Sequence, residues 1–370
     1  MIEIQGKYCL ARVFTDICEE SARGQISQLA DMPISEGERL RMMPDVHAGM
    51  GCTVGTTMTV SSGRVIPSLV GVDVGCGMLA CRLKEKHVEL QRFDKVIREK
   101  TAYGGRVRAS LHKFLPEDLL SDLACKDKIN YSWAVSSFAS LGGGNHFIEL
   151  DRDEDGSLLL VIHSGSRRLG VEVANYYQSV AFEQAKLRGE DTPKMLSALE
   201  GGEFYGYLHD LEIVTAFADA SRRAIAYDIM KEMKLHEKDS FTTVHNYIDT
   251  KRMILRKGAV SAEKDEIFLV PINMRDGSFI CKGKGNEDWN YSAPHGAGRL
   301  MSRADARESF TLSEYKKQMK GIYSSSVTSD TLDECPMAYK SIESIRENIG
   351  DTCEVISTVR PIYNFKAGNE

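Results

Sequence analysis

The turn at residues 71–78 holds two side chains whose types and spacing suit metal chemistry. Asp73 and Cys76 stand three residues apart in the sequence GVDVGCGM, and the glycines around them leave the backbone accessible. A carboxylate and a thiolate together favour a divalent transition metal such as zinc or manganese. This pair alone is weak evidence, but it gains weight from three histidines in equally unusual settings.

The motif PDVHAG places Asp45 and His47 two residues apart. In an extended segment, residues at this spacing face the same side. Two interpretations are about equally plausible. One is a turn with a solvent-facing histidine, and the other is a functional site in which Asp45 orients a ligand.

The sequence LGGGNHFIEL combines three glycines with Asn145, His146 and Glu149. Backbone amides exposed by such glycines can cradle a phosphate, and Asn145 can donate to a phosphoryl oxygen. If the segment is extended, His146 faces a site while Phe147 packs on the opposite side. The simpler alternative is a flexible loop that leads into a strand.

His163 follows the apolar run at residues 158–162 and precedes the sequence SGSRR. A histidine at the carboxyl end of a strand, followed by Arg167 and Arg168, is typical of a metal ligand beside an anion clamp. The alternative is a core histidine followed by two surface arginines. His245, in the sequence VHNY, is an ordinary loop histidine unless it completes this ligand set.

His295, in the sequence PHGAGRLMSR, is flanked by proline and small residues that leave its ring accessible to a bulky group. A helix beginning just after it would put Arg299 and Arg303 on one face, four residues apart. A reactive imidazole at a helix start, with guanidiniums behind it, suits attack on a phosphorus centre. The alternative is a helix cap with a basic outer face.

The segments around these motifs predict strands and helices in separate blocks. This arrangement indicates an α+β fold, with central sheets packed against long helices and the active site at strand ends and loops. The chain contains no linker-like or repeated segment, so residues 1–370 are predicted to form one domain. Strands are expected at residues 51–60, 66–72, 158–162 and 267–270, and helices at 171–188, 203–234, 313–319 and 341–348.

Composition predicts a soluble protein of the reducing cytoplasm. The chain is 42% hydrophobic and 27% charged, with a formal net charge of −6. No apolar run reaches the roughly 18 residues of a membrane span, and the amino terminus lacks a secretory pattern. The nine cysteines have no framework spacing, which favours free thiols. The net charge neither supports nor excludes RNA, because a local basic patch or a bound metal could overcome it.

The motifs, taken in this order, closely resemble those of the RtcB family of RNA ligases. The similarity extends from about Pro44 to Lys366, nearly the full chain. Each motif is modest evidence, whereas the ordered set is highly specific. Its elements are PDVHAGMGCTVG, GVDVGCGM, LGGGNHFIEL, HSGSRRLG, VHNYI, RKGA, PHGAGRLMSR, ECPMAYK and the lysine of FKAG.

The resemblance implies an enzyme that uses GTP and manganese to join RNA 3′-phosphate or 2′,3′-cyclic phosphate ends to 5′-hydroxyl ends. His295 would be the catalytic nucleophile and become guanylylated. GMP would then pass to the RNA, giving an RNA(3′)pp(5′)G intermediate. Two manganese ions would be bound by a set of ligands in which Cys76 bridges, namely Asp73, Cys76, His146, His163 and His245.

The resemblance also implies binding residues around this centre. Arg167 and Arg299 would hold RNA phosphate. Asp45 and His47 would contact the metal ligands, and not the metal, and hold those ligands in position. The nucleotide would be contacted by Asn145, Glu149, Asn246, Asn273, Met274, Ser278, Gly296, Ala297, Gly298, Tyr339 and Lys366.

The chain departs from the family pattern at residues 271–278, where PINMRDGS stands in place of a Gly-Ser-Met-Gly-type loop. Asn273 replaces a serine, and Arg275 and Asp276 add charges, so nucleotide preference or the RNA substrate could differ. The chain is also short for the family, which suggests a divergent branch that lacks peripheral RNA-binding insertions and is specialised for RNA repair rather than tRNA splicing.

Two other functions stay open beside RNA ligation. A metal-dependent phosphoesterase would open cyclic phosphates without ligating, and a non-catalytic RNA-binding factor would keep only the fold. The complete ligand set and His295 argue against a decayed site. The sequence specifies neither the natural RNA nor a helper or ribosome-rescue partner.

Overall fold

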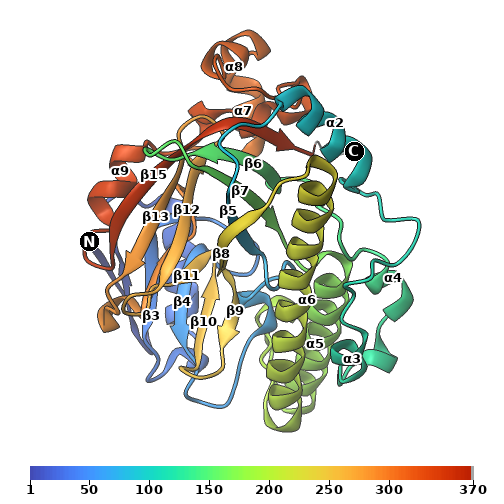
Figure 1. Ribbon diagram of the computed structural model, residues 1–370. Helices are drawn as coiled ribbons and strands as arrows, with labels where there is room; N and C mark the ends of the chain where they lie inside the picture. The colour runs from blue at the N-terminus through green and yellow to red at the C-terminus, as the bar shows by residue number, and fades with distance from the viewer. Residues whose placement is uncertain (368–370) are drawn as a thin grey trace.

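The computed structural model describes residues 1–367, and it confirms the α+β class with two large sheets and two long helices (Figure 1). The described helices are α1 (Glu20–Ala30), α2 (Leu90–Lys100), α3 (Glu117–Ser121), α4 (Tyr131–Val135), α5 (Arg167–Leu187), α6 (Gly201–Met233), α7 (Arg303–Ser309), α8 (Leu312–Gln318) and α9 (Ile342–Asn348). Short 3₁₀ helices occur at Pro33–Ser35, Pro67–Leu69, Lys126–Lys128, Lys194–Leu196, Glu287–Trp289, Ser329–Glu334 and Pro336–Ala338.

The larger sheet is antiparallel throughout and has the strand order β12-β13-β15-β6-β7-β5-β8. It curls so far that its edge strands meet, and the Leu269 amide of β12 donates to Thr243 Oγ1 of β8 at 3.0 Å. Its strands are β5 (Gly77–Leu83), β6 (Phe147–Arg152), β7 (Leu158–Ser164), β8 (Glu237–Val244), β12 (Ile267–Asn273), β13 (Gly277–Gly283) and β15 (Cys353–Lys366).

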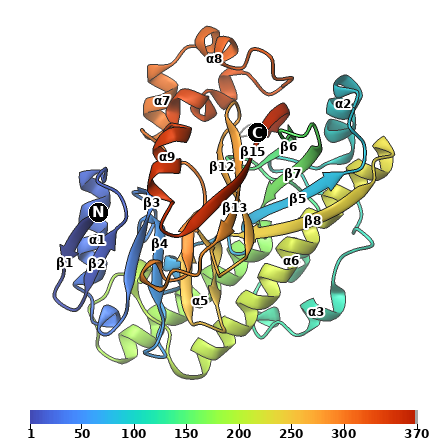
Figure 2. The same cartoon turned by 60° about the vertical axis from the view of Figure 1, so that its left-hand side comes forward.

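The second sheet has six strands in the order β1-β2-β3-β4-β10-β9, and a small pair of strands, β11 and β14, accompanies it. Only the β2–β3 pairing is parallel. Figure 2 shows this sheet beside the curled one, with α7 and α8 together at one end of the molecule. The strands are β1 (Ile2–Gln5), β2 (Leu10–Val13), β3 (Leu40–His47), β4 (Val54–Thr59), β9 (Asn246–Asp249), β10 (Ile254–Lys257), β11 (Ala259–Ser261) and β14 (Ser292–Pro294).

Strand β7 shows how side-chain alternation fills both faces of the curled sheet. Leu158, Leu160 and Ile162 belong to the core that includes residues of α5 and α6, whereas Leu159 and Val161 pack inside the curl. Each such buried side chain contributes roughly 1.5–3 kcal/mol relative to exposure. Because residues two apart share a face, the strand delivers His163 to the inner side of the curl.

Helix α6 lies against β5 and β7 of this sheet, and α5 packs beside α6 (Figure 1). Helix α6 buries residues on most of its circumference, which suits a helix enclosed between a sheet and other helices. No helix of the described chain combines the length and apolarity needed to cross a membrane.

Most predicted elements are confirmed, but two predictions are wrong. Residues 66–72 are not a strand, because Pro67–Leu69 forms a 3₁₀ helix with proline at its first position, where its fixed φ is favourable. No helix follows His295 directly, since α7 begins only at Arg303, after the Ser302 cap. Gly298, with φ of +73°, interrupts any helix there.

Candidate functional site

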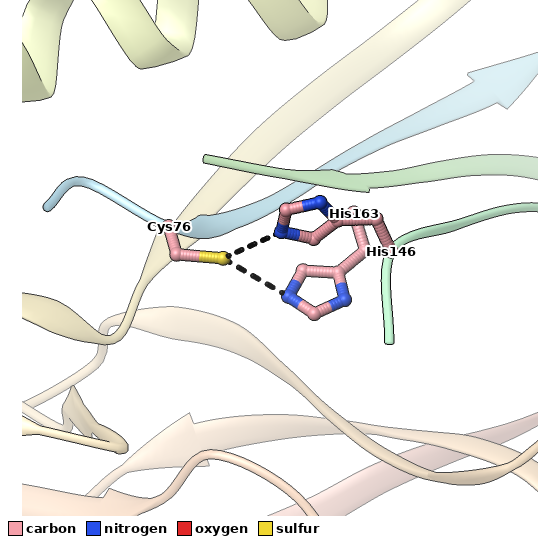
Figure 3. A group of neighbouring side chains, drawn as sticks. All are labelled: Cys76, His146 and His163. Carbon is pink, nitrogen blue, oxygen red and sulfur yellow. Dashed lines mark hydrogen bonds between the residues drawn. The ribbon is translucent and has the colours of Figure 1, made fainter. Parts of the chain in front are cut away.

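Cys76, His146 and His163 converge in a buried cluster (Figure 3). Cys76 Sγ lies 3.4 Å from His146 Nε2 and 3.3 Å from His163 Nε2. The potential ligand atoms of all three residues lie within 4.8 Å of one another, a spacing that one metal ion could bridge.

Adjacent strands of the curled sheet bring these residues together. Cys76 precedes β5, His146 precedes β6, and His163 lies near the end of β7. The pairing sets Phe147 and Met78 opposite His163, which aligns the three positions at one edge of the sheet. A metal site at strand ends follows directly from this register.

The structure brings the other two predicted ligands to the same place. Asp73 Oδ2 lies 3.2 Å from His146 Nε2, and the His245 ring centroid lies 5.2 Å from that of His163. The backbone amide of His245 donates to the Cys76 carbonyl at 2.9 Å, which ties the end of β8 to the metal turn. His245 is therefore positioned as part of the cluster and not as an ordinary loop histidine.

The donor set fits a divalent transition metal. Nδ1 of His245 is buried and has no hydrogen-bond partner among the described residues, as expected of an atom awaiting a ligand. Burial lowers the pKa of His163 and of His245, which keeps both rings neutral and able to bind metal. Burial, followed by the charge of Asp73, raises the pKa of the Cys76 thiol, so a bound cation is needed to favour the thiolate.

Two residues that the sequence did not single out support the metal turn. Arg222 of α6 is fully buried, and its Nη1 donates to the carbonyls of Gly75 and Ser164 at 2.8 and 2.7 Å. Gly165 lies so close to Asp73 that a Cβ there would stand 1.9 Å from Oδ1. Arg222 could have been noticed in the sequence, because it is a charged residue near apolar residues in the middle of a long predicted helix.

His295 lies at the end of β14, and Asp45 holds its ring. The Nδ1 atom of His295 is 2.6 Å from Asp45 Oδ2, and its ring centroid is 5.0 Å from that of His245. With the proton on Nδ1 donated to the carboxylate, Nε2 keeps a lone pair. Asp45 was expected to orient a metal ligand, and the structure places it on His295 instead.

His47 lies beside this pair, with its Nδ1 2.9 Å from the Asp45 carbonyl oxygen. Burial lowers the pKa of His47. Its ring lines both cavities that meet at His295.

One of these cavities, of about 210 Å³, is walled by most of the residues that the resemblance assigned to the nucleotide. Ser278 and Asn246 lie outside its wall. Ser278 is buried on β13 opposite Pro271, and the Asn246 side chain bridges the Asp73 carbonyl and the Gly258 amide. The assigned residues that line the cavity are Asn145, Glu149, Asn273, Met274, Gly296, Ala297, Gly298, Tyr339 and Lys366.

Glu149 and Lys366 give this cavity a charged inner end. Asn364 Nδ2 donates to Glu149 Oε1 at 2.5 Å, and burial raises the pKa of Glu149 to about 7. Its neighbour Asp151 is buried on the same face of β6 without a hydrogen-bond partner among the described residues, and burial also raises the pKa of Asp151.

Glu334 organises the opposite wall, although sequence analysis gave it no role within the ECPMAYK motif. It is 2% exposed, pairs with Lys366, and accepts from Tyr339 Oη at 2.7 Å and Arg303 Nη1 at 2.6 Å. Burial opposes its ionisation, but Lys366 and Arg303 lower the pKa of Glu334 to about 2. The carboxylate therefore holds three residues of the cavity wall in place.

The two arginines expected to contact RNA have different settings. Arg167 Nη1 lies 3.3 Å from His146 Nδ1. The Arg167 guanidinium also packs closely against Gly142, since a Cβ added to this glycine would lie 2.1 Å from it. Arg299 lines the nucleotide cavity, where it donates to the Asp333 carbonyl at 2.6 Å and to Tyr339 Oη at 3.1 Å.

The divergent loop at residues 271–278 neutralises its own added charges. Arg275 Nε and Nη2 donate to the two carboxylate oxygens of Asp276 at 2.8 and 2.7 Å. Asn273 accepts from the amides of both residues, and its side chain therefore closes the turn between β12 and β13.

Comparison with known proteins agrees with this arrangement. The family model described as tRNA-splicing ligase RtcB matches residues 25–114 and 120–367. The chain is 29% identical to RNA-splicing ligase RtcB of Escherichia coli (strain K12), and the alignment covers 94% of each protein. It is 28% identical to RNA-splicing ligase RtcB2 of Escherichia coli (strain ATCC 25922), with coverage of 94% and 92%.

An archaeal relative extends the similarity beyond bacteria. The chain is 26% identical to tRNA-splicing ligase RtcB of Aeropyrum pernix, across 87% of this chain and 86% of that protein. The match to the family model covers nearly the whole sequence, from residue 25 to residue 367, apart from a gap of a few residues. The chain therefore belongs to the RtcB family.

Proposed function

We propose that this protein is a GTP- and manganese-dependent RNA ligase that joins 3′-phosphate or 2′,3′-cyclic phosphate ends to 5′-hydroxyl ends, in RNA repair or splicing. The observation that carries the proposal is the Asp45–His295 pair beside the cluster of Cys76, His146 and His163. Membership of the RtcB family and the ligase names of the relatives support it. A cytoplasmic location, with residues 1–370 acting as one ligase domain, is part of the proposal; residues 368–370 lie outside the described chain.

In the first step, His295 Nε2 attacks the α-phosphorus of GTP. A nitrogen–phosphorus bond forms, the bond to the bridging oxygen breaks, and pyrophosphate leaves. Asp45 accepts the Nδ1 proton in a hydrogen bond throughout, which fixes the tautomer and stabilises the charge that develops on the ring.

In the following steps GMP is transferred from the histidine to the RNA. An oxygen of the RNA 3′-phosphate attacks the GMP phosphorus and the bond to Nε2 breaks, giving RNA(3′)pp(5′)G. The 5′-hydroxyl then attacks the RNA phosphorus, and GMP leaves. A 2′,3′-cyclic phosphate is hydrolysed beforehand: water attacks the phosphorus, the bond to the 2′-oxygen breaks, and a 3′-phosphate with a 2′-hydroxyl is left. Arg167 and Arg299 are proposed to hold RNA phosphate during these steps.

Manganese would be held by Asp73, Cys76, His146, His163 and His245, two ions in all, and would polarise phosphoryl oxygens. In the nucleotide cavity, Glu149 would accept from the N–H edge of guanine while Lys366 donates to its carbonyl oxygen. The other lining residues would enclose the ribose and phosphates.

A ligation assay with three RNA ends tests the function. The protein, GTP and manganese are expected to join 3′-phosphate and cyclic phosphate ends to a 5′-hydroxyl, and to leave 3′-hydroxyl ends unjoined. The variant His295→Ala should lose ligation of both phosphorylated ends. Opening of the cyclic phosphate without ligation, retained in full by His295→Ala, would favour a phosphoesterase, and failure of the wild-type protein to bind manganese would favour a non-catalytic factor.

A further inference from the structure

A second cavity, of about 360 Å³, opens on the other side of His295 from the nucleotide cavity. The two cavities share four wall residues, His47, Asn145, His245 and His295, and the second also reaches Asp73 and Cys76. Its volume falls within the range of small-molecule sites. A group bound there would lie directly beside the metal centre. Asn145 and Asn246, which the resemblance assigned to the nucleotide, also line this cavity, but its Met50, Val72 and Met195 have no assigned role.

The wall of this second cavity is mainly apolar, and much of its mouth is exposed. Met50 is 74% exposed, Val72 43% and Met195 38%, although these residues come from three separate segments. Exposed apolar side chains gathered at one opening mark a binding surface more often than chance. The deeper wall includes Val54, Pro67 and Val70.

Two polar side chains of the cavity, Lys257 and Gln178, are already occupied by the protein. Lys257 Nζ has three N–H groups, and it donates to the carbonyls of Met50, Cys52 and Ser68. Gln178 accepts from the Ser68 amide at 2.9 Å and donates to the Lys194 carbonyl. These two side chains therefore have no donor left for a phosphate, and the apolar wall beside them favours a flat, apolar group.

We propose that this second cavity receives the nucleobase of the RNA nucleotide that carries the 3′-phosphate. The inference rests on the proposed ligase function. That nucleotide must stay at the metal centre through both RNA steps, whereas the 5′-hydroxyl end is needed only in the last. An unstacked terminal base offers apolar faces to Met50, Val72 and Met195, while Asn175, exposed at the rim, can pair with its polar edge.

Abasic RNA tests the proposal with the intact protein. Removing the base from the 3′-phosphate nucleotide should lower the ratio of ligation rate to KM about tenfold or more, since burying a flat group against an apolar wall contributes roughly that much. Removing the base from the 5′-hydroxyl nucleotide should change it less than twofold. An equal or larger effect at the 5′ nucleotide, or none at either, overturns the assignment.

A double variant, Met50→Ala with Met195→Ala, locates the effect in this second cavity. With ordinary RNA, the double variant should lower the ratio of ligation rate to KM about tenfold. With RNA that is already abasic at the 3′ nucleotide it should have little further effect, because the variant and the missing base remove the same contact. Leu187→Ala is the matched control, since Leu187 is 88% exposed on α5 and does not line the cavity. Additive losses would contradict the proposal. Guanylylation of the wild-type protein by GTP and manganese, without RNA, is measured in parallel, and its absence would count against the ligase function instead.

Discussion

Asp45 meets His295 through one carboxylate oxygen, while the other oxygen is buried without a hydrogen-bond partner in the described chain. This arrangement commits the carboxylate to a single imidazole nitrogen. The pair resembles the orienting contact found in nucleophilic triads, where the carboxylate sets the tautomer of the ring.

Replacing Asp45 by asparagine tests this role. The amide can donate to Nδ1 and so favour the tautomer with the proton on Nε2, which removes the nucleophilic lone pair. Guanylylation by GTP is expected to fall at least about 100-fold. Manganese content, measured on the same sample, should stay close to that of the wild type. Unchanged guanylylation would show that Asp45 has only a structural role.

Glu149 gives nucleotide binding a dependence on pH. Its folded-state pKa is raised to about 7 by burial, so the carboxylate form that accepts from guanine is depleted below this value. Guanosine affinity, measured without metal so that the metal ligands do not contribute, should rise as the pH increases from 6 to 8 and then level off.

The variant Glu149→Gln is the control for that titration. It should bind guanosine weakly and with a flat pH profile, because the carboxyl that accepts from the base has been replaced by an amide that does not titrate. A wild-type profile that is flat, or that falls as the pH rises, would contradict the assignment of Glu149 as the base acceptor.

At the scale of elements, the site depends on how α6 supports the strand ends. Arg222 reaches from the helix to the turn at Gly75 and to the end of β7 at Ser164. Its neighbour Arg223 is half-exposed and pairs only with carboxylates such as Asp219 at the surface. The two arginines thus offer a matched comparison within one helix.

Arg222→Met should lower manganese affinity about 10–100-fold, the usual effect of removing a residue that positions metal ligands. It should also reduce the free energy of unfolding by about 3 kcal/mol, because two buried carbonyls lose their donor. Arg223→Met should change neither quantity appreciably. Isothermal titration with manganese and chemical denaturation measure both, and equal effects from the two variants would contradict this role for Arg222.

Local sequence patterns predicted the ligands at the strand ends, but they did not predict contacts between residues that are far apart in the sequence. His163 follows an apolar run, so its placement at a sheet edge could be inferred from periodicity. Asp45 and His295 are 250 residues apart, and no local pattern links them. The role of Glu334 was missed for the same reason, since its partner Lys366 lies on another element.

The two incorrect element predictions have local physical causes. The apolar pattern of residues 66–72 was compatible with a strand, but Pro67 favoured the first turn of a 3₁₀ helix. The basic pattern after His295 was compatible with a helix, but Gly298 adopts a positive φ and delays the helix to Arg303. In both cases one proline or glycine outweighed the side-chain pattern.

Across the whole molecule, the proposed metal ligands are spread from Asp73 to His245 and join four strand ends of the curled sheet. Binding of manganese should therefore stabilise the fold as a unit. At a concentration 100 times the dissociation constant the gain is about 2.7 kcal/mol, which corresponds to a rise in Tm of a few degrees for a chain of this size.

Thermal unfolding with manganese and with a chelator measures that gain. The double variant Cys76→Ser with His163→Ala should lose the manganese-dependent shift. His209→Ala should retain it, because His209 is an exposed histidine of α6 that contacts the Asp122 carbonyl far along the chain from the cluster. A shift that persists in the double variant would place the metal elsewhere.

The most direct measurement is the site of nucleotide attachment after incubation with α-labelled GTP and manganese. We expect one acid-labile GMP per chain, mapped by peptide mass spectrometry to His295, and none in His295→Ala. No adduct in a manganese-loaded wild-type protein, or an adduct on any other residue, would contradict the central claim.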